Sequence, residues 1–384
     1  MRTTGRFVVA LVFVAATMSQ ADDGERLLSL DHYVRVRSTV PAISGQTTQI
    51  YVREVVLAGT ALRSTAAADR VVLFIHGAGT PAEVAFDVPY QDYSWMGYLA
   101  RAGFDVFSMD MTGYGRSTRP AAMNDPCNLS HGQQMTTLAS DWNDIDGVVN
   151  HLLALRHVDQ VEMVAWSLGG PRSAGYTAQH PDKVKKLVLL APAYNRDSPG
   201  QPPAQVPASG AAMTTQSHEE FTANWDRQVG CPNQYEPATS DAVWKAMIES
   251  DRVGATWGTG VRRAPQVTSW GWNGSVVAKM KTPVLMVSGV HDKQVPQERV
   301  KVLYQDLGSS QKVFVDLACS SHNAMWEKKP PAVVQGIARM ADEGNRQRLR
   351  AGNVEAGLLD SRGSNTTTST SPCVPASRLR QVSN

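Results

Sequence analysis

Apolar and polar residues recur along most of the chain in two rhythms, one typical of strands and the other of helices. Apolar runs, several of them typical of strands covered on both faces, lie at 70–75, 104–109, 161–166, 184–190 and 283–290, and a further strand is expected at 312–317. Amphipathic segments typical of helices lie at 93–102, 140–155, 168–180, 297–307 and 324–342. The segments 33–37 and 49–56 alternate residue by residue and are expected to be antiparallel edge strands. This alternation predicts an α/β fold with a mostly parallel central sheet flanked by helices.

One stretch, residues 192–281, interrupts this alternation after the sixth expected strand. Its first part is rich in Pro, Gln and Ala, and its remainder holds five tryptophans: Trp225, Trp244, Trp257, Trp270 and Trp272. We expect an insertion that covers the cleft of the sheet as a lid. Its tryptophans would either hold the lid together or contact an apolar substrate. The expected α/β core is therefore split into residues 22–191 and 282–343.

The two ends of the chain depart from the globular pattern. Residues 1–21 resemble a cleavable signal peptide, with Arg2 and Arg6 before a short apolar run and a small-x-small site at 19–21. The apolar run is too short to span a bilayer as a helix, and an uncleaved anchor is the alternative. The polar residues 344–384 are expected to form a disordered tail. These features predict a secreted or periplasmic protein.

Composition argues against some partners and leaves the disulfides open. With a formal net charge of +2 over 384 residues and no dense run of Lys and Arg, the chain is not expected to bind nucleic acid or to insert stably into a membrane. Export would allow its four cysteines to form disulfides. We favour Cys127–Cys231, because both residues lie in loop-rich segments, and Cys319 would then pair with Cys373. Separate buried thiols are the alternative, and the oligomeric state stays open.

The candidate nucleophile stands where an apolar run ends. Residues 161–166 precede Ser167, and the small residues Ala165 and Gly169 lie two positions before and after it. This spacing is typical of a nucleophile elbow, in which the serine occupies a sharp turn from strand to helix. Ser167 is therefore the predicted nucleophile. A serine that only caps the following helix would occupy the same position.

Two further polar residues, Asp292 and His322, each follow one of the last two expected strands. Since the carboxyl ends of parallel strands meet at one edge of a sheet, both are expected near Ser167. His322 is the predicted base, and Asp292 is the predicted acid that orients its imidazole. Taken singly, either residue could be a simple cap. His291, beside Asp292, is expected to be structural.

Acyl transfer also requires N–H groups that stabilise negative charge on oxygen. The backbone N–H groups of Leu168, directly after the nucleophile, and of Ala78, in the loop that follows 70–75, are the predicted donors of this oxyanion hole. His76 is expected to hydrogen-bond within its loop and shape it, and not to act as the base.

Three acidic residues, Asp141, Asp144 and Asp146, lie near the start of an expected helix. A metal site is one interpretation. The helix dipole already favours acidic residues at this position, so we expect no metal and no other cofactor.

Together these motifs resemble the α/β-hydrolase superfamily over residues 33–342. The resemblance rests on His76-Gly77-Ala78-Gly79, Asp110-x-x-Gly113-x-Gly115-x-Ser117, the Ser167 elbow, Gly289-x-x-Asp292-x-x-Val295-Pro296 and His322. It implies the α/β-hydrolase fold with a lid after the sixth strand, and a triad in the order Ser, Asp, His. The departures are Ala165 in place of the first elbow glycine and the long polar tail.

The expected reaction is hydrolysis of a carboxylic ester, with a small and apolar ester as substrate. A serine in the elbow argues against the dehalogenases and epoxide hydrolases that resemble this fold, because those use aspartate there. Ser167 would form an acyl-enzyme that water then releases. An amidase or peptidase, and a hydrolase of carbon–carbon bonds, would use the same triad and remain alternatives. A non-catalytic binding protein on the same fold is the alternative of another class.

Overall fold

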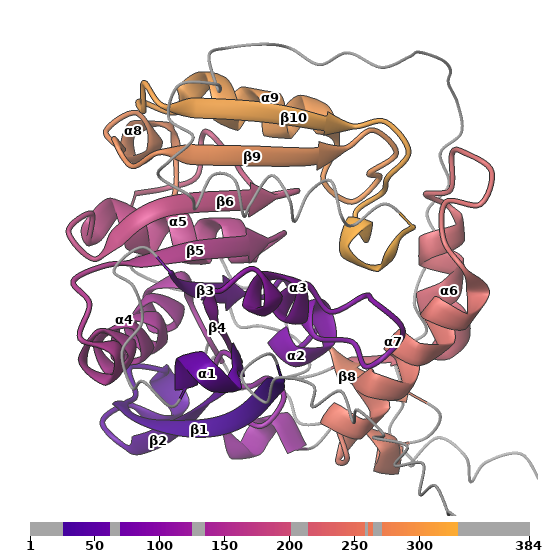
Figure 1. Cartoon of the computed structure of the whole chain (residues 1–384), viewed down its shortest axis with the longest axis horizontal. Helices are drawn as coiled ribbons and strands as arrows, with labels where there is room; N and C mark the ends of the chain where they lie inside the picture. Colours follow the sequence, from indigo (N-terminus) through magenta and orange to yellow (C-terminus); the bar gives the residue numbers. More distant parts are fainter. Residues whose placement is uncertain are drawn as a thin grey trace, which may run out of the picture.

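A computed structural model describes residues 26–61, 70–124, 135–200, 214–257, 260–263 and 271–328, and all structural statements concern these residues. Eight strands form one sheet in the order β1-β2-β4-β3-β5-β6-β9-β10 (Figure 1). Their bounds are β1 Leu27–Arg37, β2 Thr47–Leu57, β3 Val71–Ile75, β4 Asp105–Met109, β5 Val161–Trp166, β6 Val184–Leu190, β9 Val284–Gly289 and β10 Lys312–Leu317. β2 pairs antiparallel with β1 and with β4, and all the other pairs are parallel.

Helices cover both faces of the sheet, because its central strands are apolar on both sides. One face packs against α4 (Leu138–Arg156), α5 (Gly169–Gln179), α8 (Gly274–Val277) and α9 (Gln297–Asp306). The other face packs against α2 (Ala82–Phe86) and α3 (Trp95–Arg101). The remaining short elements are η2 Pro41–Ile43, α1 Ala58–Ala61, η3 Ala121–Asn124, η4 Gly254–Trp257 and η5 Ala324–Trp326. The α/β-hydrolase fold expected from the sequence is thus confirmed.

The insertion lies between β6 and β9, as the sequence predicts. It contains β7 (Thr214–Ser217), α6 (His218–Asp226), α7 (Pro237–Ser250) and β8 (Gly260–Arg263), and β7 pairs antiparallel with β8. In Figure 1, α6 and α7 lie at the right of the molecule, beyond the arrowheads of β9 and β10. The insertion therefore stands over the carboxyl ends of the strands, where the candidate site residues are expected.

The tryptophans of the insertion whose side chains are described pack against other residues of the protein. Trp225 is fully buried and stacks on Tyr235, with ring centroids 4.3 Å apart. The Trp244 ring stacks on the His218 ring, with the ring centroids 5.1 Å apart. Trp272 is fully buried among the side chains that cover the α4 and α5 face of the sheet. These three indoles hold the structure together, which is the first of the two roles expected for them.

Capping boxes mark where two of the helices, α4 and α6, begin. Thr137 and Ser140 form a capping box at the start of α4, and Ser217 and Glu220 form another at the start of α6. In each box the two side chains bond to each other's backbone N–H groups, which otherwise lack a partner at a helix start. α4 ends at His157, whose φ of 55° turns the chain out of the helix.

One sequence-based expectation is wrong. The structure joins Cys231 to Cys319, with Cα atoms 6.0 Å apart, and not Cys127 to Cys231. The physical reason is that the loop after α6 lies over the carboxyl end of β10, so Cys231 meets the cysteine that follows this strand. Cys319 is consequently not free to pair with Cys373. Cys127 and Cys373 themselves lie outside the described residues.

Several other expectations concern residues that the structure does not describe. The proposed signal peptide, the tail and Trp270 lie there, as does most of the helix expected at 324–342, which begins within the described part as the 3-10 turn η5. Among the helices that are described, none combines the length and the apolar character needed to cross a membrane.

Candidate active site

Ser167 occupies a strained turn between β5 and α5. Its φ is 57°, in the left-handed region that residues with a side chain seldom adopt. The turn is fixed from both sides, because the Ser167 N–H donates to Leu190 O at 2.9 Å, and its carbonyl accepts from Gly170 N at 2.9 Å and Ala193 N at 3.0 Å. Strain of this kind persists only where the surroundings determine it, and it is characteristic of active-site residues. The turn has the geometry of a nucleophile elbow.

Close backbone contacts explain the small residues around this turn. A Cβ at Gly169 would lie 2.4 Å from Ile75 O, and a Cβ at Gly77 would lie 2.9 Å from the Cβ of Ser167. Neither position has room for a side chain. Ala165, by contrast, is fully buried in β5 with its methyl group accommodated. The departure from the usual first glycine therefore leaves the turn intact.

His322 and Asp292 form a buried hydrogen-bonded pair. The distance from His322 Nδ1 to Asp292 Oδ2 is 2.8 Å. The other carboxylate oxygen, Oδ1, accepts from Gln294 N and Val295 N, both at 2.8 Å. A carboxylate held in this way can fix the tautomer and the orientation of the imidazole. Trp166 adds a further restraint, since its Nε1–H donates to His322 O at 2.9 Å.

A cavity of about 430 Å³ brings the predicted residues together. Ser167, His322, Ala78 and Leu168 all line it, and Asp292 lies behind His322. Within the described part of the chain, no hydrogen bond joins Ser167 Oγ to His322. Such bonds are often long until a substrate is bound. All five predicted site residues thus belong to one site.

The two predicted oxyanion-hole residues lie on the wall of the same cavity as Ser167. Both Ala78 and Leu168 line the cavity, and in the described residues neither backbone N–H donates to another protein group. Leu168 occupies the N-cap position of α5, so its N–H is not used inside the helix. Two free N–H groups beside a serine are what stabilisation of an oxyanion requires.

The cavity wall combines aromatic and polar side chains. Its aromatic lining residues are Trp166, Tyr194, Phe221 and Trp326, and its amide side chains are Asn195, Gln216, Asn224, Gln294 and Asn323. Phe221 and Asn224 come from α6, so the insertion forms part of the wall. Among the eighteen described lining residues, Arg299 alone carries a permanent charge.

His76 shapes the oxyanion loop, as expected. Its Nε2 accepts from Met111 N at 3.1 Å, and its Nδ1 lies 2.7 Å from Gly77 O. Burial, and then the charge of Arg172, hold the pKa of His76 well below its usual range. A neutral ring that accepts at Nε2 carries its proton at Nδ1 and donates it to Gly77 O. His76 is therefore a fixed part of the loop.

Arg172 is a residue of this site that the sequence did not reveal. It is fully buried in α5. Its Nη1 donates to His76 O and Gly77 O, both at 3.1 Å, and its Nε donates to Asp141 Oδ2 at 2.7 Å. The guanidinium thus ties the elbow helix to the loop that presents Ala78. An arginine inside a helix gives no sequence signal for such a role.

The three acidic residues near the start of α4 serve structural purposes. Asp141 pairs with Arg172, and Asp144 accepts from Thr112 N at 3.0 Å. Asp146 Oδ1 accepts from Tyr176 Oη at 3.0 Å and from Lys183 Nζ at 2.7 Å. Burial, together with the charge of Asp141, raises the pKa of Asp144 to about 7. Within the described ranges, no group of three or more His, Cys, Asp or Glu could hold a metal ion.

Comparison with known proteins places the chain in a family. The family described as "Serine aminopeptidase, S33" matches residues 66–329, which is more than half of the chain. The chain belongs to this family. Its members are serine hydrolases with the α/β-hydrolase fold, in agreement with the elbow, the sheet and the insertion found here.

Curated relatives and solved structures are similar at low identity. Over 270 residues this chain is 24% identical to the AB hydrolase superfamily protein YisY of Bacillus subtilis. The match covers 68% of this chain and 87% of YisY. It is 32% identical over 87 residues to the human (Lyso)-N-acylphosphatidylethanolamine lipase, covering 23% of this chain and 22% of the lipase. The chain thus matches less than a quarter of that relative's length.

A solved structure supports the assignment of the fold. The structure of a thermophilic esterase from Thermogutta terrifontis has a TM-score of 0.51 with this chain at 14% identity, and it covers 80% of this chain and 97% of the esterase. At this identity the likeness concerns the fold.

Proposed function

We propose that the protein is a secreted serine hydrolase that cleaves carboxylic esters through an acyl-enzyme on Ser167. The observation that carries this proposal is the single cavity of about 430 Å³ that Ser167 and His322 share, with Asp292 bonded behind the histidine at 2.8 Å. A serine at an elbow, a histidine and a buried carboxylate are the groups that acyl transfer requires.

The reaction follows from these groups. His322 takes the proton of the Ser167 hydroxyl as Oγ attacks the carbonyl carbon of the ester. The carbonyl oxygen becomes negatively charged and accepts hydrogen bonds from the backbone N–H groups of Ala78 and Leu168. His322 then gives its proton to the leaving alcohol, and the same histidine activates the water that releases the acid. Asp292 stabilises the imidazolium in both steps and keeps its own charge.

The substrate we propose is a small-molecule ester whose apolar part packs on the aromatic wall. Trp166, Phe221 and Trp326 supply that wall. Export is proposed on the signal-like residues 1–21, and the Cys231–Cys319 disulfide is consistent with an oxidising compartment. The expected location is therefore outside the cytoplasm, secreted or periplasmic.

A second candidate is hydrolysis of an amide or peptide bond. The family is named after a serine aminopeptidase, and an amidase would use the same three residues. The amide side chains of the cavity wall, such as Asn195 and Gln216, suit hydrogen bonding to a peptide.

The test is hydrolysis of p-nitrophenyl esters of graded acyl length by the protein and by Ser167→Ala. We expect kcat to fall by about 10⁴-fold or more in the variant, because loss of the nucleophile removes the acyl-enzyme route. If folded protein hydrolyses no ester but a phosphonate still labels Ser167, hydrolysis of an amide becomes the preferred proposal. Absence of labelling at Ser167 would leave a non-catalytic binding protein.

A further inference from the structure

One side chain of the insertion forms hydrogen bonds with two loops, the loop that carries Asp292 and the loop that carries His322. Gln228, just after α6, accepts at Oε1 from Lys293 N at 3.2 Å and from His322 N at 3.3 Å. Its Nε2 donates to Asn224 O at 3.1 Å, which fixes the amide to the end of α6. The residue is 1% exposed, so water does not compete for these bonds. A single amide oxygen therefore spans the backbone next to Asp292 and the backbone of His322.

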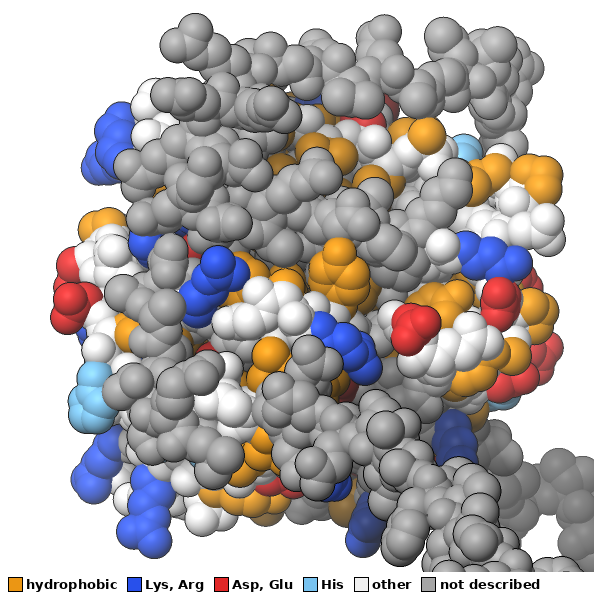
Figure 2. Space-filling model, viewed as in Figure 1, with side chains coloured by type: hydrophobic (Ala, Val, Ile, Leu, Met, Phe, Trp, Pro, Cys, Tyr) orange, Lys and Arg blue, Asp and Glu red, His pale blue; other side chains and the backbone are white. Residues whose placement is uncertain are grey.

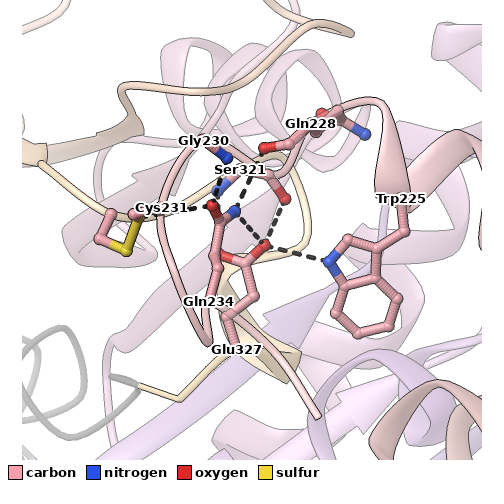
Figure 3. Close-up of a disulfide and its surroundings, with 8 residues drawn as sticks. Trp225, Gln228, Gly230, Cys231, Gln234, Ser321 and Glu327 are labelled. Atoms are coloured by element: carbon pink, nitrogen blue, oxygen red, sulfur yellow. Dashed lines mark hydrogen bonds between the residues drawn. A yellow bond between two sulfur atoms is a disulfide. The ribbon is translucent and has the colours of Figure 1, made fainter. Parts of the chain in front are cut away.

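A buried carboxylate makes a second connection between the insertion and the histidine loop (Figure 3). Glu327 is 1% exposed, and its Oε2 accepts from Ser321 N at 2.9 Å. Its Oε1 accepts from Ser321 Oγ at 2.5 Å, from Trp225 Nε1 at 3.1 Å and from Gln234 Nε2 at 2.9 Å. Ser321 directly precedes His322, whereas Trp225 and Gln234 belong to the insertion. Glu327 thus joins the two segments.

The Cys231–Cys319 disulfide makes the third connection. Figure 3 shows it beside Gln234, whose Oε1 accepts from Gly230 N at 2.9 Å. The Gln234 amide also donates to Gln228 O at 3.3 Å, so the three connections form one network. A covalent bond and two buried polar groups hold residues 225–234 against the loop that carries His322.

We propose that residues 225–234 form a clamp, with Gln228 as the positioning residue that keeps His322 aligned on Asp292, and that this clamp stays docked during turnover. The proposal rests on the proposed function of His322 as the base. Gln228 is not among the described residues that line the cavity. Its loss should therefore act on the catalytic step through His322, with little effect on substrate binding.

The test compares Gln228→Leu with Gln228→Glu. Leucine removes the acceptor and leaves two buried N–H groups unbonded, so we expect kcat to fall by about 10- to 100-fold with KM within about twofold. Glutamate restores the acceptor oxygens, so kcat should return to within about threefold of the original protein. The matched control is Gln179→Leu, at an exposed glutamine near the end of α5. A loss in Gln228→Leu no larger than in this control, or a loss expressed in KM, would overturn the proposal.

The pH profile gives a readout that a purely structural role would not move. Glutamate at 228 adds a negative charge beside His322, so the acidic limb of the kcat/KM profile should shift to higher pH. The other ionisable groups around this position are Asp292, Lys293 and His291 after β9, Glu327 after β10, and Asp226 and Arg227 in the insertion. They are unchanged in the variant, so an unshifted limb would mean that residue 228 does not act on His322.

The double variant Cys231→Ser/Cys319→Ser tests the docking even where Gln228→Leu fails to fold. Loosening the clamp should lower kcat by about 3- to 10-fold, on the scale of one or two lost restraints. A variant that turns over faster would show that this segment must open, and would overturn the proposal. If the original protein hydrolyses no ester but Ser167 is labelled by a phosphonate, the labelling rate replaces kcat. The clamp and the ester reaction can thus fail separately.

A different observation carries a second inference, about the substrate. Arg299 is the one permanent charge among the described cavity-lining residues, and no acidic side chain lies on that wall. It occupies the third position of α9, where the helix dipole disfavours a cation. The side chain has no ion pair within the described part of the chain. Its exposed guanidinium is thus a cation that borders the cavity without an acidic partner among the described lining residues.

We infer that the preferred ester carries an anionic group, a carboxylate or a phosphate, that binds Arg299. This inference rests on the proposed ester hydrolysis. The probes are the p-nitrophenyl ester of hexanoic acid, the mono-p-nitrophenyl ester of adipic acid, and the corresponding ester of 5-phosphonopentanoic acid. The three share a similar chain length and differ in the terminal group.

We expect Arg299→Gln to lower kcat/KM for the anionic esters by about 10-fold while the hexanoate stays within about twofold, as for loss of a charge-assisted hydrogen bond. The ester that loses more identifies the carboxylate or the phosphate as the preferred group. The control is Lys301→Gln, an exposed cation of the same helix that does not line the cavity. Equal losses on all three esters would overturn the inference. No turnover of any ester, with Ser167 unlabelled, would instead refute the proposed function.

Discussion

The serine and the histidine of the candidate site are held in place by two different means. Ser167 is fixed mainly by backbone atoms, through a positive φ, the tight packing at Gly169 and backbone hydrogen bonds to β6 and to the segment directly after β6. His322 is fixed by groups far away in the sequence, including Gln228, 94 residues before it, and Trp166, 156 residues before it. One half of the site, the local half, is held by the backbone packed around the elbow, and the other half is held by side chains of distant segments.

This difference has a mechanical consequence. A turn determined by backbone sterics forms together with the strand and helix that flank it, and it tolerates no added volume. A loop determined by remote side chains tolerates changes in its own sequence but depends on the folding of the insertion. Figure 2 shows the side chains on one face of the molecule, where the described Lys and Arg residues are dispersed among apolar and polar groups. The restraints on the site described above are buried contacts.

The largest effect is expected from Gly169→Ala, which tests the local half. The added Cβ would lie 2.4 Å from Ile75 O, a backbone atom that cannot move without disturbing β3. We expect a loss of stability of about 3 kcal/mol or more, with loss of hydrolysis, measured by thermal unfolding and ester assay. The matched control is Ala165→Gly at the other end of the elbow. It should cost about 1 kcal/mol and keep most of the activity, since glycine fits wherever alanine does. Equal effects at both positions would contradict the steric account.

Arg172→Met removes a side chain that ties the helix after Ser167 to the loop that presents Ala78. It therefore tests a side-chain restraint on the serine half of the site. The variant leaves Asp141 buried without its partner and frees the carbonyl groups of His76 and Gly77. We expect a loss of about 3 to 5 kcal/mol of stability, the usual cost of breaking a buried ion pair. The double variant Arg172→Met/Asp141→Leu should recover part of it in chemical denaturation. Recovery of none would mean that the carbonyl bonds, and not the ion pair, are what matters.

Trp166→Phe tests one distant contact of the histidine. Phenylalanine keeps an aromatic side chain, although a smaller one than indole, and removes the N–H that donates to His322 O at 2.9 Å. Leaving a buried carbonyl without a partner costs about 1 to 2 kcal/mol, so kcat should fall by about 5- to 30-fold. KM of a short-chain ester is expected to change less than kcat. A variant with unchanged kcat would show that Gln228 and Asp292 suffice to place His322.

The smallest effect on activity is expected from Asp144→Asn, and its effect on stability depends on pH. Burial, with the charge of Asp141, raises the pKa of Asp144 to about 7, against about 3.9 in an unfolded chain. Between these values the folded state binds the proton more strongly, so this group's contribution to stability is largest near pH 4 and declines as the pH rises to 7. Asparagine keeps an acceptor for Thr112 N without the charge. The variant should therefore show a flatter dependence of Tm on pH between 4.5 and 8, and an unchanged slope would exclude Asp144 as its source.

Much of the fold was predictable from periodicity alone. The dense apolar runs correspond to the strands β3 to β6 and β9, because a strand covered on both faces must be apolar throughout, whereas β10 is a half-buried edge strand. The helix expected at 168–180 matches α5, and the expected insertion follows β6. The disulfide was not predictable. Four cysteines allow three complete pairings, and spacing does not say which loops meet in space.

The candidate site divides in the same way. Ser167, Asp292, His322 and the oxyanion residues could be predicted, because short motifs at strand ends mark them. Arg172 and Glu327 could not, since a buried arginine in a helix or a glutamate near a turn carries no local signature. Their roles arise from partners far apart in sequence, such as Trp225 and Glu327, which are 102 residues apart.

The sequence by itself predicted the sheet, the elbow and the order of the candidate triad, because apolar periodicity and short motifs mark them. Only the tertiary structure decided how the histidine is held. The loop after α6 reaches the end of β10 through the packing of the whole insertion, and this brings Cys231 to Cys319 and Gln228 to His322. Local sterics and periodicity are encoded in neighbouring residues, whereas a contact across about 90 residues exists only once the chain has folded.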